Sequence, residues 1–107
     1  MLHRYLVQNV DTPARVMDGN AVIITPQDAV LHTLNEVGTF IWARADGTRT
    51  VGQIVEQMVV SFEVSPEQAR EDATQFIEAC VARGLMHLSD APAPVDLTPV
   101  LSGANLL

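Results

Sequence analysis

Residues 14–25 read Ala-Arg-Val-Met-Asp-Gly-Asn-Ala-Val-Ile-Ile-Thr, and this stretch decides the fold class. Two apolar runs flank the Asp-Gly-Asn at positions 18–20. Glycine accepts the positive φ that a tight hairpin turn needs, so the pattern predicts two antiparallel strands. A second turn at residues 26–28 (Pro-Gln-Asp) leads into a third run, in which successive side chains from Val30 to Leu34 alternate between two faces. The sequence therefore predicts a three-stranded antiparallel meander.

Two helices are predicted next from their capping residues and apolar spacing. Asn35 is a good N-cap for the first helix, and the Asp-Gly at 46–47 is expected to end it. Thr50 opens the second helix, and Gln53 completes a capping-box pattern. The apolar stripe of the first helix is Val37, Phe40, Ile41 and Ala45, and that of the second is Val51, Ile54, Val55, Met58 and Val59.

A third helix begins at Ser65, with Pro66 at its first position, and Gly84 is expected to end it. Its apolar stripe is Ala69, Ala73, Phe76, Ile77, Cys80 and Val81. Residues 85–88 form a short closing strand or extended segment. The predicted fold class is α+β, a winged helix-turn-helix-like arrangement in which a three-stranded antiparallel sheet is followed by three helices.

Composition divides the chain into three parts. Residues 1–14 form a weakly patterned N-terminal extension, residues 15–88 form the domain, and residues 89–107 form an extended tail. Prolines at positions 92, 94 and 99 exclude a regular helix across that part of the tail. The tail also carries apolar residues such as Val95 and Leu97, so it is expected to dock on something rather than act as a solvated linker.

Charge and length exclude several classes of protein. The chain has 107 residues, 13 acidic and 6 basic, all of the latter Arg, and a formal net charge of −7. This balance argues against a protein that holds phosphate backbones, so no nucleic acid is expected as a partner. No apolar run approaches the ~20 residues of a membrane span, and no signal peptide is visible. A cytoplasmic domain that does not bind a membrane is therefore expected.

A catalytic or metal-binding constellation is not predicted. His3, His32 and His87 are scattered, and none lies at a ligand spacing from another His or from Cys80. Cys80 lies on the apolar stripe of the third helix, where a small buried core residue is expected. The glycines show neither a Walker nor a dinucleotide-binding spacing. The chain is therefore expected not to be an enzyme, and no cofactor or metal is predicted.

The helix order suggests a winged-helix DNA-binding regulator as an alternative. The helix that would enter the major groove starts Glu67-Gln68-Ala69-Arg70-Glu71-Asp72, and its three carboxylates would be repelled by phosphate.

With an enzyme and a DNA-binding protein disfavoured, a protein-binding module is the remaining class of function. The edge strand of a meander offers unpaired N–H and C=O groups to an extended peptide, unless the tail or a second copy of the chain covers that edge.

The stretch from Leu34 to Trp42 (Leu-Asn-Glu-Val-Gly-Thr-Phe-Ile-Trp) resembles the PqqD-like family. So does the stretch from Asp46 to Val55, which reads Asp-Gly-Thr-Arg-Thr-Val-Gly-Gln-Ile-Val. The pattern is Leu-Asn, Gly three residues after Asn, an aliphatic-Trp pair, Asp-Gly, and Thr-Val followed by Ile. The hairpin upstream and the Gly-Leu at 84–85 fit as well, and the resemblance covers about residues 14–88.

The resemblance implies a RiPP precursor peptide recognition element, a non-catalytic chaperone. It would bind the leader of a ribosomally synthesised precursor peptide by strand addition and present it to a maturation enzyme, in PQQ biosynthesis a radical SAM enzyme. The leader would pair with the third strand and lie against the third helix. The peptide-binding residues would then be Val30, Leu31, His32, Thr33, Ala69, Arg70, Ala73, Phe76 and Ile77. Within this signature, Asn35 is interpreted as a helix N-cap, Gly38 as a position that allows a close approach, and Trp42 as a core residue.

Two further expectations concern partners. The excess of acidic residues favours a partner peptide or enzyme surface with basic residues, mainly through faster encounter. An alternative role is a structural or oligomerising domain, in which a sheet edge or the tail forms a homodimer. Neither the precursor peptide nor the pathway, PQQ or another, follows from the sequence.

Overall fold

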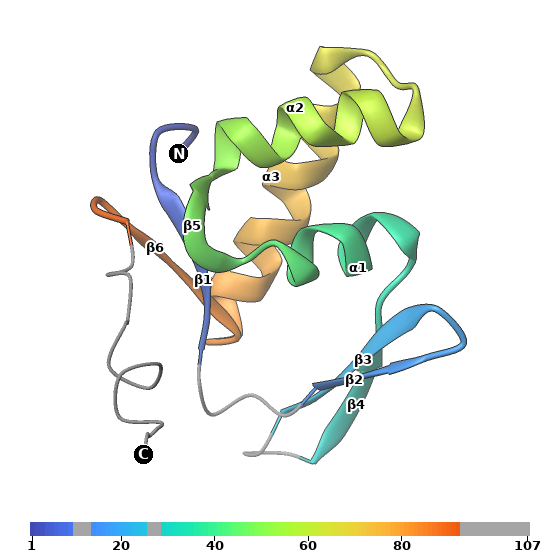
Figure 1. The fold of residues 1–107 in the computed structure, drawn as a ribbon. Helices are drawn as coiled ribbons and strands as arrows, with labels where there is room; N and C mark the ends of the chain where they lie inside the picture. The colour runs from blue at the N-terminus through green and yellow to red at the C-terminus, as the bar shows by residue number, and fades with distance from the viewer. Residues whose placement is uncertain (10–13, 26–28, 93–107) are drawn as a thin grey trace, which may run out of the picture.

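The computed structural model describes residues 1–9, 14–25 and 29–92, and it has the predicted mixed α+β fold (Figure 1). The predicted turn at 26–28 and the tail from residue 93 onward lie outside the described residues. The strands are β1 (Tyr5–Gln8), β2 (Ala14–Met17), β3 (Asn20–Thr25), β4 (Val30–Thr33), β5 (Asp46–Thr50) and β6 (Met86–Ser89). The helices are α1 (Glu36–Ala43), α2 (Val51–Phe62) and α3 (Pro66–Ala82).

The predicted meander is present as a sheet with the strand order β2-β3-β4. Met17 lies opposite Asn20 in the hairpin, and the two turn residues between them, Asp18 and Gly19, have φ of 55° and 85°. Both angles are positive, as a two-residue hairpin turn requires. β3 lies in the middle of this sheet, so β2 and β4 are both edge strands.

A second sheet, with the order β5-β1-β6, corrects the sequence-based division of the chain. The sequence predicts residues 1–14 as an extension outside the domain, but β1 is the central strand of this sheet and Leu6 is fully buried. The first helix also ends at Ala43, before the Asp-Gly at 46–47, because residues 46–50 pair with β1 instead. A four-residue strand with one buried side chain has no recognisable local pattern, and its partner residues lie 39 to 84 positions away along the chain.

All three predicted helix starts are confirmed. The side chains of Asn35, Thr50 and Ser65 each accept a hydrogen bond from the backbone N–H three residues later. The Thr50–Gln53 pair makes both bonds of a capping box. Gly84 follows α3 with a φ of +73°, as a C-terminal glycine should.

One core joins the two sheets to the helices. In Figure 1, α1 lies between the small β2-β3-β4 sheet and the α2–α3 pair. Ala21 and Ile23 of β3 are buried in the same apolar cluster as Ile41, Ile54 and Ile77 of the three helices. Trp42 and Cys80 are also buried there, as predicted. Within the described residues, no helix is long and apolar enough to cross a membrane.

Leu6→Ala tests whether β1 is part of the domain. We expect it to lower the free energy of unfolding by about 2–5 kcal/mol, because it leaves a cavity beneath the central strand. Leu31→Ala is the matched control: Leu31 is 65% exposed, and its truncation should change stability by less than about 0.5 kcal/mol. Urea denaturation of both variants measures this, and equal effects would show that β1 contributes no more than a surface strand.

The buried thiol of Cys80 leads us to expect that the folded protein loses stability at alkaline pH. Burial raises the pKa of its thiol from 9.0 to about 11, so the folded state holds the thiol proton more tightly than the unfolded state. The stabilisation is complete below pH 9 and declines by up to about 2–3 kcal/mol as the pH rises towards 11. Comparing the pH dependence of unfolding with that of Cys80→Ala isolates this contribution. Parallel curves for the two proteins across this window would contradict it.

Candidate functional site

β4 is one of the two exposed edge strands of the small sheet, and it is the one that leads directly into α1. Val30 is 42% exposed and Leu31 65%, and Thr33 is also exposed. The register with β3 places Leu31 opposite Ile24 and Thr33 opposite Val22. Cross-strand partners share a face of the sheet, so these four side chains lie on the face away from the buried Ile23. β4 therefore presents both a backbone edge and an apolar outer face.

The direction of the β4 backbone groups follows from its junction with α1. The Leu34 N–H donates to the Ala21 carbonyl at 2.8 Å, so Leu34 points its polar groups towards β3. Backbone groups alternate along a strand, so Val30 and His32 point theirs the same way. Leu31 and Thr33 consequently direct their N–H and C=O groups to the open edge. An incoming strand would find up to four backbone hydrogen-bonding groups there.

The Thr39 side chain connects the β2-β3-β4 sheet to α1 through hydrogen bonding. The Ala21 N–H donates to the Thr39 hydroxyl oxygen at 2.9 Å, and that oxygen lies 3.5 Å from the Leu34 carbonyl oxygen. Asn35 caps α1 by accepting a hydrogen bond from the Gly38 N–H at 2.8 Å. The end of β4 and the start of α1 are thus held in a defined geometry beside each other.

A groove opens where β4 passes into α1, and it is closed on its other side by α3. Its volume is about 390 Å³. Gly38 lets the two helices approach, because a Cβ at this position would lie 2.9 Å from Cε1 of Phe76. We call this the α1–α3 groove; it is lined by Asn35, Val37, Gly38, Asp72, Gln75 and Phe76.

The α1–α3 groove has a polar, acidic wall and an apolar floor. Asp72 is the one charged residue among those that line it, and its carboxylate accepts a hydrogen bond from the Gln68 amide at 2.8 Å. The half-buried Phe76 ring provides the largest apolar surface in the groove. Such a site suits an extended peptide that carries an apolar side chain and a basic one.

The nine residues predicted for peptide binding divide into two groups in the structure. Val30, Leu31, His32 and Thr33 lie together on the edge strand, and Phe76 lines the neighbouring groove. Ala69, Ala73 and Ile77 are fully buried in the core, where no surface ligand reaches them. Arg70 lines a different cavity, of about 540 Å³, beside Leu2 and Gly52. The three buried positions are therefore corrections to the predicted site, whereas Arg70 is exposed and stays a prediction, away from the α1–α3 groove.

Sequence reasoning missed five of the six groove residues. Asn35 and Gly38 were noted only as a cap and a close approach, and both prove to be groove residues as well. On α3, Asp72 and Gln75 lie beside the apolar stripe rather than on it. The available signal was helical spacing, since residues three and four apart share one face of a helix: Asp72 lies four residues before Phe76, and Gln75 lies three residues after Asp72.

Comparisons with known proteins agree with this architecture. The family model of "Coenzyme PQQ synthesis protein D (PqqD)" matches residues 20–86. The solved structure "TbiB1 in Complex with the TbiA(beta) Leader Peptide" superimposes with a TM-score of 0.69 at 18% identity, and the match covers 84% of this chain and 99% of that one. At this identity the likeness shows a shared fold. The comparison with curated proteins finds no match.

The family match spans most of the small sheet, all three helices and the residues that line the α1–α3 groove. It also includes the Leu-Asn-x-x-Gly stretch, whose asparagine caps α1 and whose glycine brings α1 close to α3. The chain therefore belongs to the PqqD family, described as coenzyme PQQ synthesis protein D.

Proposed function

We propose that this chain binds the leader of a ribosomally synthesised precursor peptide, which adds to the sheet as a strand beside β4. The observation that carries the proposal is the outward direction of the Leu31 and Thr33 backbone groups, immediately before the α1–α3 groove. Backbone pairing would supply affinity, and the groove would select side chains. Membership of the PqqD family and the shared fold with TbiB1, solved with a leader peptide, support this role.

Alternation along the added strand defines which leader residues the groove would read. Every second side chain would point to the inner face of the sheet, on the side of His32, and so towards Phe76 and Asp72. The intervening side chains would lie beside Leu31 on the outer face. A leader with an apolar and a basic residue on one side of its strand fits these two groups best.

The chain acts in this proposal by presenting its peptide rather than by transforming it. The single cysteine is buried, and burial raises the pKa of its thiol to about 11, so it is poorly suited to act as a nucleophile. Among the described residues, no three His, Cys, Asp or Glu side chains gather into a metal-binding cluster. The chemistry would then belong to a maturation enzyme, for which a radical SAM enzyme is the expected class.

N-methylated leader analogues test strand addition directly. The probe is a leader peptide that binds this chain, methylated at one backbone amide at a time. Since neighbouring amides of a strand point in opposite directions, affinity should alternate along the peptide. Methylation of an amide that faces β4 should weaken binding by tenfold or more, at about 1.4 kcal/mol per lost bond. Calorimetric titration measures this, and a uniform effect at all positions would contradict strand addition.

Gly38→Ala tests the α1–α3 groove. The added Cβ would clash with Phe76 at 2.9 Å and crowd Leu34 at 3.3 Å, so the ring must move into the groove. We expect leader affinity to fall about tenfold, the effect of roughly 1–2 kcal/mol of repacking. The backbone N-methyl pattern should persist, because the β4 edge is unchanged.

Gly52→Ala is the matched control for this variant. It also adds a methyl group to a helical glycine, with a contact of 3.1 Å to the Leu2 carbonyl, but it lies on α2 outside the groove. Leader affinity should stay within about twofold of the unmodified chain. A loss of affinity in both variants would indicate a general effect on folding rather than a role for the groove.

A further inference from the structure

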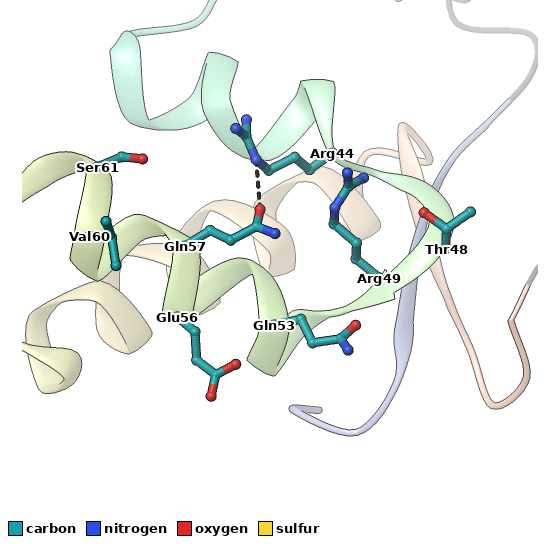
Figure 2. Close-up of a pocket in the computed structure, with 8 residues that line it drawn as sticks. All are labelled: Arg44, Thr48, Arg49, Gln53, Glu56, Gln57, Val60 and Ser61. Carbon is teal, nitrogen blue, oxygen red and sulfur yellow. Dashed lines mark hydrogen bonds between the residues drawn. The ribbon is translucent and has the colours of Figure 1, made fainter.

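A second groove lies between the end of α1, β5 and α2, and the proposed peptide site does not use it. Its volume is about 800 Å³, and Figure 2 shows its side chains. It has no residue in common with β4 or with the α1–α3 groove. We call it the α1–α2 groove; it is lined by Arg44, Thr48, Arg49, Gln53, Glu56, Gln57, Val60 and Ser61.

Arg44 is held in place on one side of this groove. Its Nε donates to the Gln57 side-chain oxygen at 2.8 Å and its Nη1 to the Phe40 carbonyl at 3.2 Å. Its guanidinium carbon also lies 3.5 Å from the centroid of the Phe40 ring. The flexible Arg side chain is thereby ordered before any ligand arrives, which lowers the entropic cost of binding.

Each of the two glutamine side chains in the groove already uses its oxygen in one hydrogen bond within the protein and keeps its NH₂ group as a donor. Gln57 uses its oxygen to accept from Arg44, and Gln53 uses its oxygen to accept from the Thr50 N–H at 2.9 Å in the capping box. Each glutamine keeps an NH₂ group that has no partner in the described part of the chain. A ligand in this groove would therefore meet two NH₂ groups that are available to donate hydrogen bonds.

The charged side chains around the groove also favour an acidic ligand. Arg49 bonds to Asp46 at 3.3 Å through one of its five N–H groups and leaves the others for a ligand. Burial and the nearby Arg49 charge both lower the pKa of Arg44, which is consistent with two cations facing the same space. In Figure 2, Glu56 points away from both guanidinium groups. Two of the chain's six basic residues thus meet here, on a protein with a net charge of −7.

The far end of the groove is apolar. Val60 is 79% exposed and lies seven residues after Gln53 on α2, about 10 Å along the helix axis. An extended peptide covers this distance with about three residues. A carboxylate at the Arg49 end and an apolar side chain three residues later would contact both parts of the groove at once.

We propose that the α1–α2 groove is a second docking surface, which takes an acidic segment of a partner protein with an apolar residue three positions after a carboxylate. Charge complementarity with the arginines and the two glutamine NH₂ groups select the carboxylates, and Val60 selects the apolar residue. The surface is independent of the proposed leader site, so both can be occupied together.

The test uses the full ¹⁵N-labelled chain and the peptide acetyl-Glu-Glu-Ser-Ser-Leu-amide as the probe. At millimolar peptide, the backbone amides of Thr48, Arg49 and Gln53 should shift, together with the side-chain NH₂ signals of Gln53 and Gln57. Arg49→Gln should weaken binding about fivefold, the loss of roughly 1 kcal/mol from one charge-assisted contact. The neutral peptide acetyl-Gln-Gln-Ser-Ser-Leu-amide should cause no comparable shifts.

Arg83→Gln is the matched control, because Arg83 is an exposed arginine at the end of α3, outside the α1–α2 groove. It should leave the binding of the acidic peptide unchanged, as should Gly38→Ala in the proposed leader site. Equal losses in Arg49→Gln and Arg83→Gln, or no shifts at these signals, would overturn the proposal. Self-association of the chain that is abolished by Arg49→Gln would also overturn the proposal, because the groove would then be a contact between two copies of the chain. Failure here would leave the leader-binding results unaffected.

Discussion

The hydrogen bond from the Ala21 N–H to the Thr39 hydroxyl, with the burial of Ala21 and Ile23 around it, is the contact on which the proposed site depends. It holds the small sheet against α1, and α1 in turn packs on α3. The open edge of β4 therefore meets the α1–α3 groove in a single geometry. If the sheet could slide or tilt on α1, a strand added to β4 would no longer run beside Phe76.

Glycine at position 38 has a comparable role between the helices. A side chain there would separate α1 from α3, because Phe76 and Leu34 already occupy the space. The same close approach also brings the Asn35 cap and the Asp72 carboxylate to the walls of one groove. A residue that looks purely structural in the sequence thus determines the shape of the candidate binding site.

The two grooves of this protein differ in the charge of their lining residues. Asp72 is the one charged residue that lines the α1–α3 groove, whereas the α1–α2 groove has two arginines, of which Arg44 is held in place, two glutamine NH₂ groups, and Glu56 turned away from the guanidinium groups. The overall charge of −7 describes neither site well. On a small domain, such a separation allows a basic peptide and an acidic protein segment to bind without competing for the same groups.

The sequence alone determined the parts of the structure whose signals are local. The hairpin at residues 18–19 and the caps at Asn35, Thr50 and Ser65 each depend on hydrogen bonds or backbone angles within about four residues. Only the tertiary structure decided the place of β1, whose two partner strands lie far along the chain. It also decided which face of α3 is open. The apolar stripe that predicts this helix is the face that neighbouring elements bury, so Ala69, Ala73 and Ile77 lie in the core. The groove lies on the adjacent face of α3, about 100° around the helix axis.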